Sequence, residues 1–98
     1  MQTIYKYSLS IIDRQTLELP VNCNILSIQP QDGIITFWAL VETSKPLIKA
    51  NFHIYGTGHP CQITQTVSYI GTCQMPNGLV WHVFLDKTVY FEASEILK

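Results

Sequence analysis

The sequence predicts an all-β protein: a single-domain antiparallel β-sandwich or small barrel of about seven strands, with a short C-terminal tail. Turn-forming residues recur about every dozen residues, and Asp32-Gly33 and Pro76-Asn77-Gly78 are the clearest of these turns. The runs between the turns are rich in Ile, Val, Thr, Tyr, Phe and Trp, which favour strands. No segment before the tail repeats apolar residues with the 3.6-residue period of a helix over a useful length. The 98 residues are enough for one domain, residues 1–98.

Seven short segments meet these criteria, and they span residues 3–9, 16–19, 25–29, 34–42, 49–55, 67–75 and 79–87. In the first segment, Tyr5 and Tyr7 fall on one face, because side chains alternate along a strand. The third segment leads through Asp32-Gly33 directly into the fourth. In the fifth segment, Phe52 and Ile54 share one face and the residues between and after them take the other.

The last two segments form the most clearly marked hairpin. Asn77-Gly78 lies between two apolar runs, and this pair predicts a type I′ turn, which needs a positive φ at both central residues. Both faces of the final segment are apolar, with Trp81 and Val83 on one and His82 and Phe84 on the other. We therefore expect a central strand that is covered on both sides, by the opposite sheet and by either the C-terminal segment or a second subunit.

The tail after Lys87 leaves two alternatives open. Val89-Tyr90-Phe91 could extend a strand, and Ala93 to Lys98 could form one helical turn. A helix that short is marginal in water.

Composition and charge exclude several classes of protein. Charged residues make up 13% of the chain and hydrophobic residues 47%, which excludes an intrinsically disordered chain. The formal net charge of −1 gives no basic surplus for phosphate contacts, so we expect no nucleic-acid partner. The longest nearly apolar stretch, Ile34 to Val41, is far shorter than the roughly 20 residues of a membrane span, and the N-terminus lacks the pattern of a secretory signal. An odd count of three cysteines predicts buried free thiols in a reducing cytoplasm.

The most distinctive local string is Gly56-Thr57-Gly58-His59-Pro60. Two glycines one residue apart can turn successive N–H groups toward an anion, and the hydroxyl and imidazole groups beside them could add to such a nest. No helix follows, so the string is neither a Walker A loop nor a complete dinucleotide fingerprint. The alternative is a strained turn at the end of a strand.

Neither a metal site nor a catalytic site is indicated. The soft metal ligands, His53, His59, Cys61, Cys73 and His82, could form a tetrahedral zinc site, but the chain contains no CxxC or HxxxH pair. A Cys–His pair is formally available, yet no known nucleophile string surrounds any cysteine, and nothing pairs the carboxylates. We therefore expect no metal, no cofactor and no enzymatic activity.

The eleven aromatic residues cannot all lie inside so small a domain. Some of them are expected to form an exposed patch, because Tyr and Trp are enriched at interface hot spots. With so few charges on the surface, the sequence predicts a homo-oligomer.

Five strings occur in a familiar order: residues 3–7, 37–41, 52–60, 69–72 and 79–84. The chain resembles a family of short, uncharacterised bacteriophage and prophage proteins, up to about Leu85. Tyr55 to Pro60 and the closing Leu79 to Phe84 are the most specific parts. The resemblance implies a phage accessory protein in the host bacterial cytoplasm, and it brings no activity with it.

These observations favour a non-catalytic protein that binds and inhibits a host protein, such as a component of antiviral defence, including a CRISPR complex. Two alternatives remain: a small-ligand binder that sequesters a nucleotide-derived signal, and a minor virion or assembly protein. The expected site for a ligand or partner combines the glycine-rich string with nearby aromatic and histidine side chains, namely Tyr55, Gly56, Thr57, Gly58, His59, Trp38, Trp81 and His82.

Overall fold

The structure is a computed structural model of the chain, and it describes residues 1–87. Every regular element in this range is a strand, and the seven strands are β1 (Gln2–Leu9), β2 (Arg14–Pro20), β3 (Asn24–Gln31), β4 (Ile34–Glu42), β5 (Leu47–Gly56), β6 (Val67–Gln74) and β7 (Val80–Asp86). This confirms the predicted all-β class and each expected strand. The two alternatives for the tail concern residues that lie outside the described range. This part of the chain also holds no helix that could cross a membrane.

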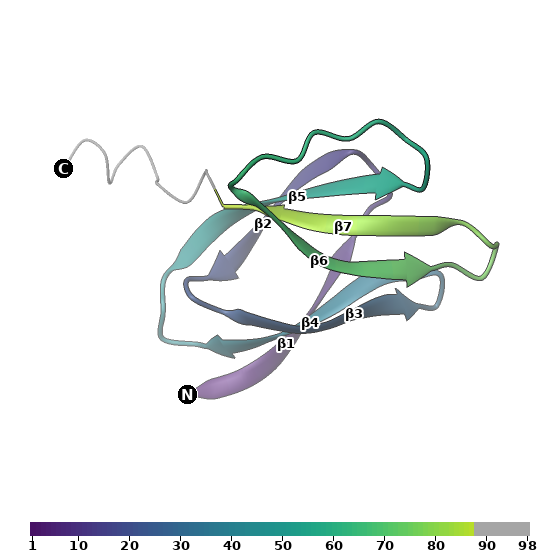
Figure 1. The fold of residues 1–98 in the computed structure, drawn as a ribbon. Helices are drawn as coiled ribbons and strands as arrows, with labels where there is room; N and C mark the ends of the chain where they lie inside the picture. Colours follow the sequence, from purple (N-terminus) through teal and green to yellow (C-terminus); the bar gives the residue numbers. More distant parts are fainter. Residues whose placement is uncertain (88–98) are drawn as a thin grey trace.

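The strands form two antiparallel sheets that face each other (Figure 1). One sheet has three strands in the order β1-β4-β3, and the other has four in the order β2-β5-β7-β6. The expected central position of the last strand is confirmed, since β7 lies between β5 and β6. On the outward face of β7 the ring of Phe84 contacts those of Tyr55 and Tyr69, with centroids 5.8 and 5.6 Å apart.

The core lies between the sheets and follows from the alternation of side chains. On β4, Ile35, Phe37, Ala39 and Val41 are buried in the core. Phe37 meets Phe52 of β5 across the core, with ring centroids 5.3 Å apart. Packed rings and branched side chains of this kind supply most of the hydrophobic stabilisation of a small domain.

Two glycine turns show how local sequence sets the hairpins. Asp32 and Gly33 both have positive φ, 52° and 77°, and join Gln31 to Ile34 as a two-residue type I′ turn. The predicted type I′ turn at Asn77-Gly78 was wrong: here Gly78 has a positive φ of 88° and Asn77 does not. Pro76 explains the difference, because a two-residue turn would close with a bond from the amide of residue 76 to the Leu79 carbonyl, and proline has no N–H.

The resulting connection is a three-residue hairpin loop that ends in a left-handed glycine. The Gly78 amide donates to the Met75 carbonyl (2.9 Å), and the Met75 amide donates to the Leu79 carbonyl (2.8 Å). The hairpin itself is therefore confirmed, and β7 begins one residue later than expected.

The two sheets meet where β3 and β6 approach each other. A Cβ added to Gly71 of β6 would lie 2.1 Å from Cγ2 of Ile28 on β3, so only a glycine fits this contact. Both strands carry a β-bulge near this point, between Ile25 and Ser27 and between Tyr69 and Gly71. Bulges bend strands, and these two lie on the side of the contact where β3 and β6 begin.

The sandwich thus has two different ends (Figure 1). We call the end with the turns at 32–33, 56–59 and 75–78 the turn end. We call the other end the open end; it contains the turns at 20–23 and 43–46, the start of β6 and Lys87. The connection of residues 57–66 runs from the turn end to the open end, where the Lys87 amide donates to the Thr66 carbonyl (2.8 Å).

Candidate binding site

At the turn end, the glycine-rich string forms a type II turn. The His59 amide donates to the Gly56 carbonyl at 3.0 Å, and Gly58 has a φ of 84° at the third position of the turn. Thr57 occupies the second position and is exposed. The His59 N–H, one of the donors expected to face an anion, is used within the turn itself.

The ring of His59, an exposed side chain, lies directly against Gly56. A Cβ at Gly56 would be 2.7 Å from His59 Cε1 and 2.8 Å from its Nδ1. The same ring meets the Trp81 indole edge to face, with centroids 6.2 Å apart. Trp81 and Gly56 are paired across β7 and β5, so three of the predicted site residues, Gly56, His59 and Trp81, assemble here. The buried Trp81 Nε1 has no partner within residues 1–87.

His82 holds the turn to the outward face of the four-stranded sheet. Its Nε2 lies 2.7 Å from the Thr57 hydroxyl, and its Nδ1 lies 3.0 Å from the Thr72 hydroxyl. The Tyr69 hydroxyl extends the chain, 2.6 Å from Thr72 Oγ1. A neutral imidazole has one donor and one acceptor, and a hydroxyl can serve either, so both ring nitrogens are satisfied. The arrangement fastens the turn and leaves neither ring nitrogen without a partner.

Tyr55 belongs to a second cluster on the same face. Its hydroxyl lies 3.3 Å from His53 Nδ1 and accepts from the Gln62 amide (3.5 Å). His53 is 6% exposed, and its Nε2 lies 3.6 Å from Asp86 Oδ2. The connection of residues 57–66 is thereby fastened over this face of the sheet at Gln62.

Trp38 lies far from these residues. It follows Phe37 on β4, and because Phe37 points into the core, Trp38 points outward from the three-stranded sheet. Its neighbours there are Lys6 and Ser27 on the adjacent strands. The structure therefore does not bring Trp38 to the glycine-rich turn, contrary to the expectation of a combined site.

The cysteines occupy three different environments. Cys73 is buried in the core, Cys23 is half-buried and Cys61 is exposed, and all three are free thiols. The expectation of buried thiols was therefore wrong for Cys61, which belongs to the irregular connection after β5.

The metal ligands weighed from the sequence are separated by the alternation of β6 and β7. Cys73 pairs with Trp81 and Thr72 with His82, so Cys73 faces the core while His82 faces outward. Within residues 1–87 no group of three or more His, Cys, Asp or Glu side chains is placed to hold a metal ion.

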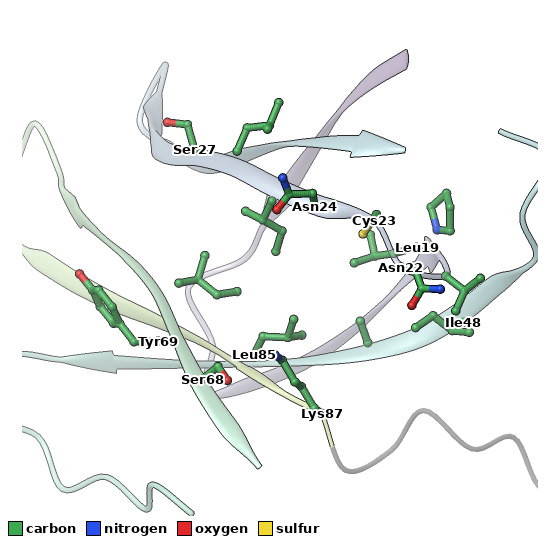
Figure 2. A pocket seen from close by; sticks show the side chains of 16 residues that line it. Leu19, Asn22, Cys23, Asn24, Ser27, Ile48, Ser68, Tyr69, Leu85 and Lys87 are labelled. Atoms are coloured by element: carbon green, nitrogen blue, oxygen red, sulfur yellow. The ribbon is translucent and has the colours of Figure 1, made fainter. Parts of the chain in front are cut away.

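The open end contains a cleft of about 750 Å³, shown in Figure 2. This volume falls within the range of about 300–1,000 Å³ that is typical of small-molecule sites. The cleft opens beside both β-bulges, and its walls come from β2, β3, β5, β6, β7 and the turn after β2. Its apolar lining residues are mainly aliphatic, and they include Leu19, Ile25, Ile48, Ala50, Ile70 and Leu85.

Polar groups surround this apolar surface on two sides. Figure 2 shows Asn22, Asn24 and Ser27 on the β3 side, and Ser68 and Lys87 on the side of β6 and β7. Asn22 has a φ of 60°, which asparagine tolerates better than most residues, and the Cys23 amide closes this turn on the Pro20 carbonyl (3.3 Å).

Cys23 also lines the cleft, and burial raises the pKa of its thiol above the ordinary value. The thiol therefore stays protonated and neutral at physiological pH, and a protonated thiol is a poor nucleophile. Among the described lining residues there is no histidine, aspartate or glutamate that could act as a base for it.

None of the residues expected to form the site lines this cleft. The cleft residues are common aliphatic, amide and hydroxyl side chains drawn from five strands and a turn, and no local string marks them. The two bulges beside the cleft interrupt strand register without any glycine or proline at the extra position, so they leave little trace in the sequence pattern. The one local signal is Asn22, which follows Pro20-Val21 at a break between strands.

Comparison with known proteins gives one match. The family model described as a domain of unknown function, DUF7352, matches residues 1–91. No curated protein and no solved structure matches the chain.

Proposed function

The chain belongs to the DUF7352 family, and we propose that this member is a non-catalytic protein that binds a small molecule in the cleft at its open end. The observation that carries the proposal is the cleft itself: about 750 Å³, with an aliphatic floor and a few polar groups at its rim. Concave sites with apolar walls and a small number of orienting polar groups are the usual form of ligand pockets.

Binding without chemistry fits the cleft better than catalysis. The nucleophile candidate, Cys23, is held in its protonated form by burial, which raises its pKa. The lining residues on the described strands offer hydroxyl, amide and ammonium groups, which can orient a ligand but are poor general bases at neutral pH.

The resemblance to phage and prophage proteins suggests where such binding would act. In an infected bacterial cytoplasm, a protein that holds a small molecule without converting it lowers the free concentration of that molecule in proportion to the protein present. We propose this stoichiometric role for the chain.

The experiment measures the binding of a neutral apolar probe, N-phenyl-1-naphthylamine, by its fluorescence. It compares the wild-type protein with a variant in which a larger side chain fills the cleft. Ser68→Phe places a ring in the cleft, and we expect at least a tenfold loss of probe affinity. Gln74→Phe introduces the same ring at the other end of β6, where residue 74 is exposed, and should leave affinity unchanged. A wild-type protein that fails to bind the probe, or equal binding by both variants, would refute the cleft as a ligand site.

A second candidate function uses the outward face of the three-stranded sheet. There Trp38 and Leu40 are half-buried beside Ile4, which is 55% exposed, and Lys6 lies at the edge. An aromatic residue with aliphatic neighbours and a polar border is typical of a protein interface, which would suit a host protein or a second copy of the chain.

Sedimentation velocity distinguishes a second copy of the chain from a host protein, because it reports whether the chain associates with itself. If the chain forms the expected homo-oligomer through this face, Trp38→Glu should shift it to the monomer, while Tyr69→Glu, on the other sheet and 60% exposed, should not. A wild-type monomer at all concentrations would leave a different protein as the partner for this face.

A further inference from the structure

We propose that the ligand of the cleft is an aliphatic acid: a molecule with a flexible hydrocarbon body and a single carboxylate. This inference rests on the proposed function and adds the chemical class of the ligand. It follows from three properties of the lining: the shape of its apolar groups, the sign of its charge and the kind of its neutral polar groups.

The apolar groups fit a hydrocarbon chain better than a planar ring. Leu19, Ile25, Ile48 and Leu85 present branched aliphatic surface, which packs well against methylene groups and offers no flat face. Tyr69 is the aromatic residue of the described lining, but its ring already contacts Phe84 and its hydroxyl bonds Thr72 on the outward face. Stacking on aromatic faces is the usual way to hold a base, so the cleft lacks what a nucleotide needs.

The charge of the cleft selects an anion. Lys87 is the charged side chain of the described lining, which contains neither aspartate nor glutamate. Figure 2 shows the Lys87 side chain on the side of the cleft formed by β6 and β7, where Leu85 also lines it. Lys87 is exposed, so an anion at this position meets a single cation at the mouth of the cleft, and their attraction is that of a solvent-accessible ion pair.

One neutral polar group lies on the same side of the cleft as Lys87. This is Ser68, whose hydroxyl can donate to an oxyanion without adding charge, while Asn22 and Asn24 offer neutral donors on the β3 side. The protonated Cys23 thiol adds no negative charge that would oppose it. A phosphomonoester brings close to two negative charges at neutral pH, and a single lysine would leave one of them unpaired.

The test compares decanoate with 1-decanol by isothermal titration calorimetry, both below the concentration at which they aggregate. The two molecules share the hydrocarbon body and differ in charge. We expect decanoate to bind about two- to fivefold more tightly, as the attraction of a solvent-accessible ion pair predicts. Lys87→Gln should abolish this preference, because it removes the charge and keeps much of the length of the side chain. Lys6→Gln, on the outward face of the three-stranded sheet, should retain it.

The other possible results each contradict either the aliphatic acid or the proposed function. Equal affinities in the wild-type protein, or a preference that survives Lys87→Gln, would overturn the aliphatic acid and leave the cleft as a neutral site. Tighter binding of adenosine monophosphate than of decanoate would replace the acid with a nucleotide. Binding of N-phenyl-1-naphthylamine without any binding of decanoate would refute this inference alone, whereas failure to bind that probe would refute the proposed function.

Discussion

The two ends of the sandwich differ in how they use their polar groups. At the turn end, Thr57, His82, Thr72 and Tyr69 bond one another in a continuous chain. At the open end, the amides of Asn22 and Asn24 and the Lys87 ammonium group face a cleft of about 750 Å³. Groups that satisfy one another stabilise a fold, whereas groups that face a concave surface can bind something else.

The comparison also shows that a conspicuous string is not evidence of a site. The glycines of the 56–60 string are explained by a type II turn and by the His59 ring that lies against Gly56. Both explanations are steric and local. The cleft has no such string, because each of its walls contributes only one or a few ordinary residues.

The largest expected effect concerns the contact that separates the two ends. Gly71→Ala places a Cβ 2.1 Å from Cγ2 of Ile28, a β-branched side chain that cannot rotate away easily. We expect a loss of about 1–3 kcal/mol in the free energy of unfolding, measured with urea. To relieve the clash, β3 and β6 must move apart, and the cleft opens beside this contact. The affinity of the cleft for N-phenyl-1-naphthylamine should therefore change as well.

The control for that substitution is the double variant. In an Ile28→Ala background the clash is gone, so adding Gly71→Ala should cost much less than it does in the wild-type protein. Additive free energies in this double-mutant cycle would contradict the proposed contact.

A smaller effect is expected for the hydrogen-bonded chain at the turn end. Thr72→Val keeps the shape of the side chain and removes its hydrogen bonds to His82 Nδ1 and to the Tyr69 hydroxyl. We expect a loss of about 0.5–1.5 kcal/mol in unfolding free energy and no change in probe binding at the open end.

The matched control for Thr72→Val is Thr64→Val in the 57–66 connection. Thr64 is exposed, and its hydroxyl contacts only the Thr66 hydroxyl among the described side chains, at 3.0 Å. Water can replace that exposed contact, so this variant should change the unfolding free energy much less. A change in probe affinity with Thr72→Val would show that the two ends are coupled.

The smallest effect concerns the charged contact at the open end. The N-terminal ammonium group of Met1 and the Ser44 hydroxyl hydrogen-bond the Glu42 carboxylate and lower its pKa below the ordinary value. A lowered pKa stabilises the folded state when the carboxylate is ionised; this contribution is present at neutral pH and is lost as the pH falls through the lowered pKa.

Glu42→Gln should therefore reduce stability slightly at neutral pH and leave it unchanged in acid below that pKa. Thermal unfolding followed across this pH range measures the difference, with Glu18→Gln on the exposed face of β2 as the control. A stability difference that stays constant with pH would show that the contact does not depend on the charge.

Most of the fold could be predicted from the sequence, for local reasons. Strand positions follow from β-branched and aromatic runs between turn residues, and the facing of Phe52 and Ile54 follows from simple alternation. The type of the last turn was predicted wrongly because Pro76, immediately before Asn77-Gly78, has no N–H to close a two-residue turn, so the hairpin closes on Met75 and Leu79 instead.

The site was much less predictable. Two paired strands and a short turn do bring Thr57, His59, Trp81 and His82 near Gly56 along the chain. They divide between the two faces of the sheet, however, with His59 and Trp81 on the core side and Thr57 and His82 on the outward side. Trp38 does not join them, since its placement depends on which sheet receives β4 and which face that sheet turns to the core. Alternation along the strand shows that Trp38 and Phe37 point to opposite faces of the sheet. It does not show which residues of other strands pack against either side chain.

The sequence by itself determined the all-β class, the seven strands, the hairpins and the alternation of buried and exposed side chains, because each depends on neighbours along the chain. The tertiary structure decided the pairing of strands into two sheets, the approach of Ile28 to Gly71 and the cleft that opens beside the bulges. These features depend on residues far apart in the chain, and no local pattern of residues records which distant surfaces will meet.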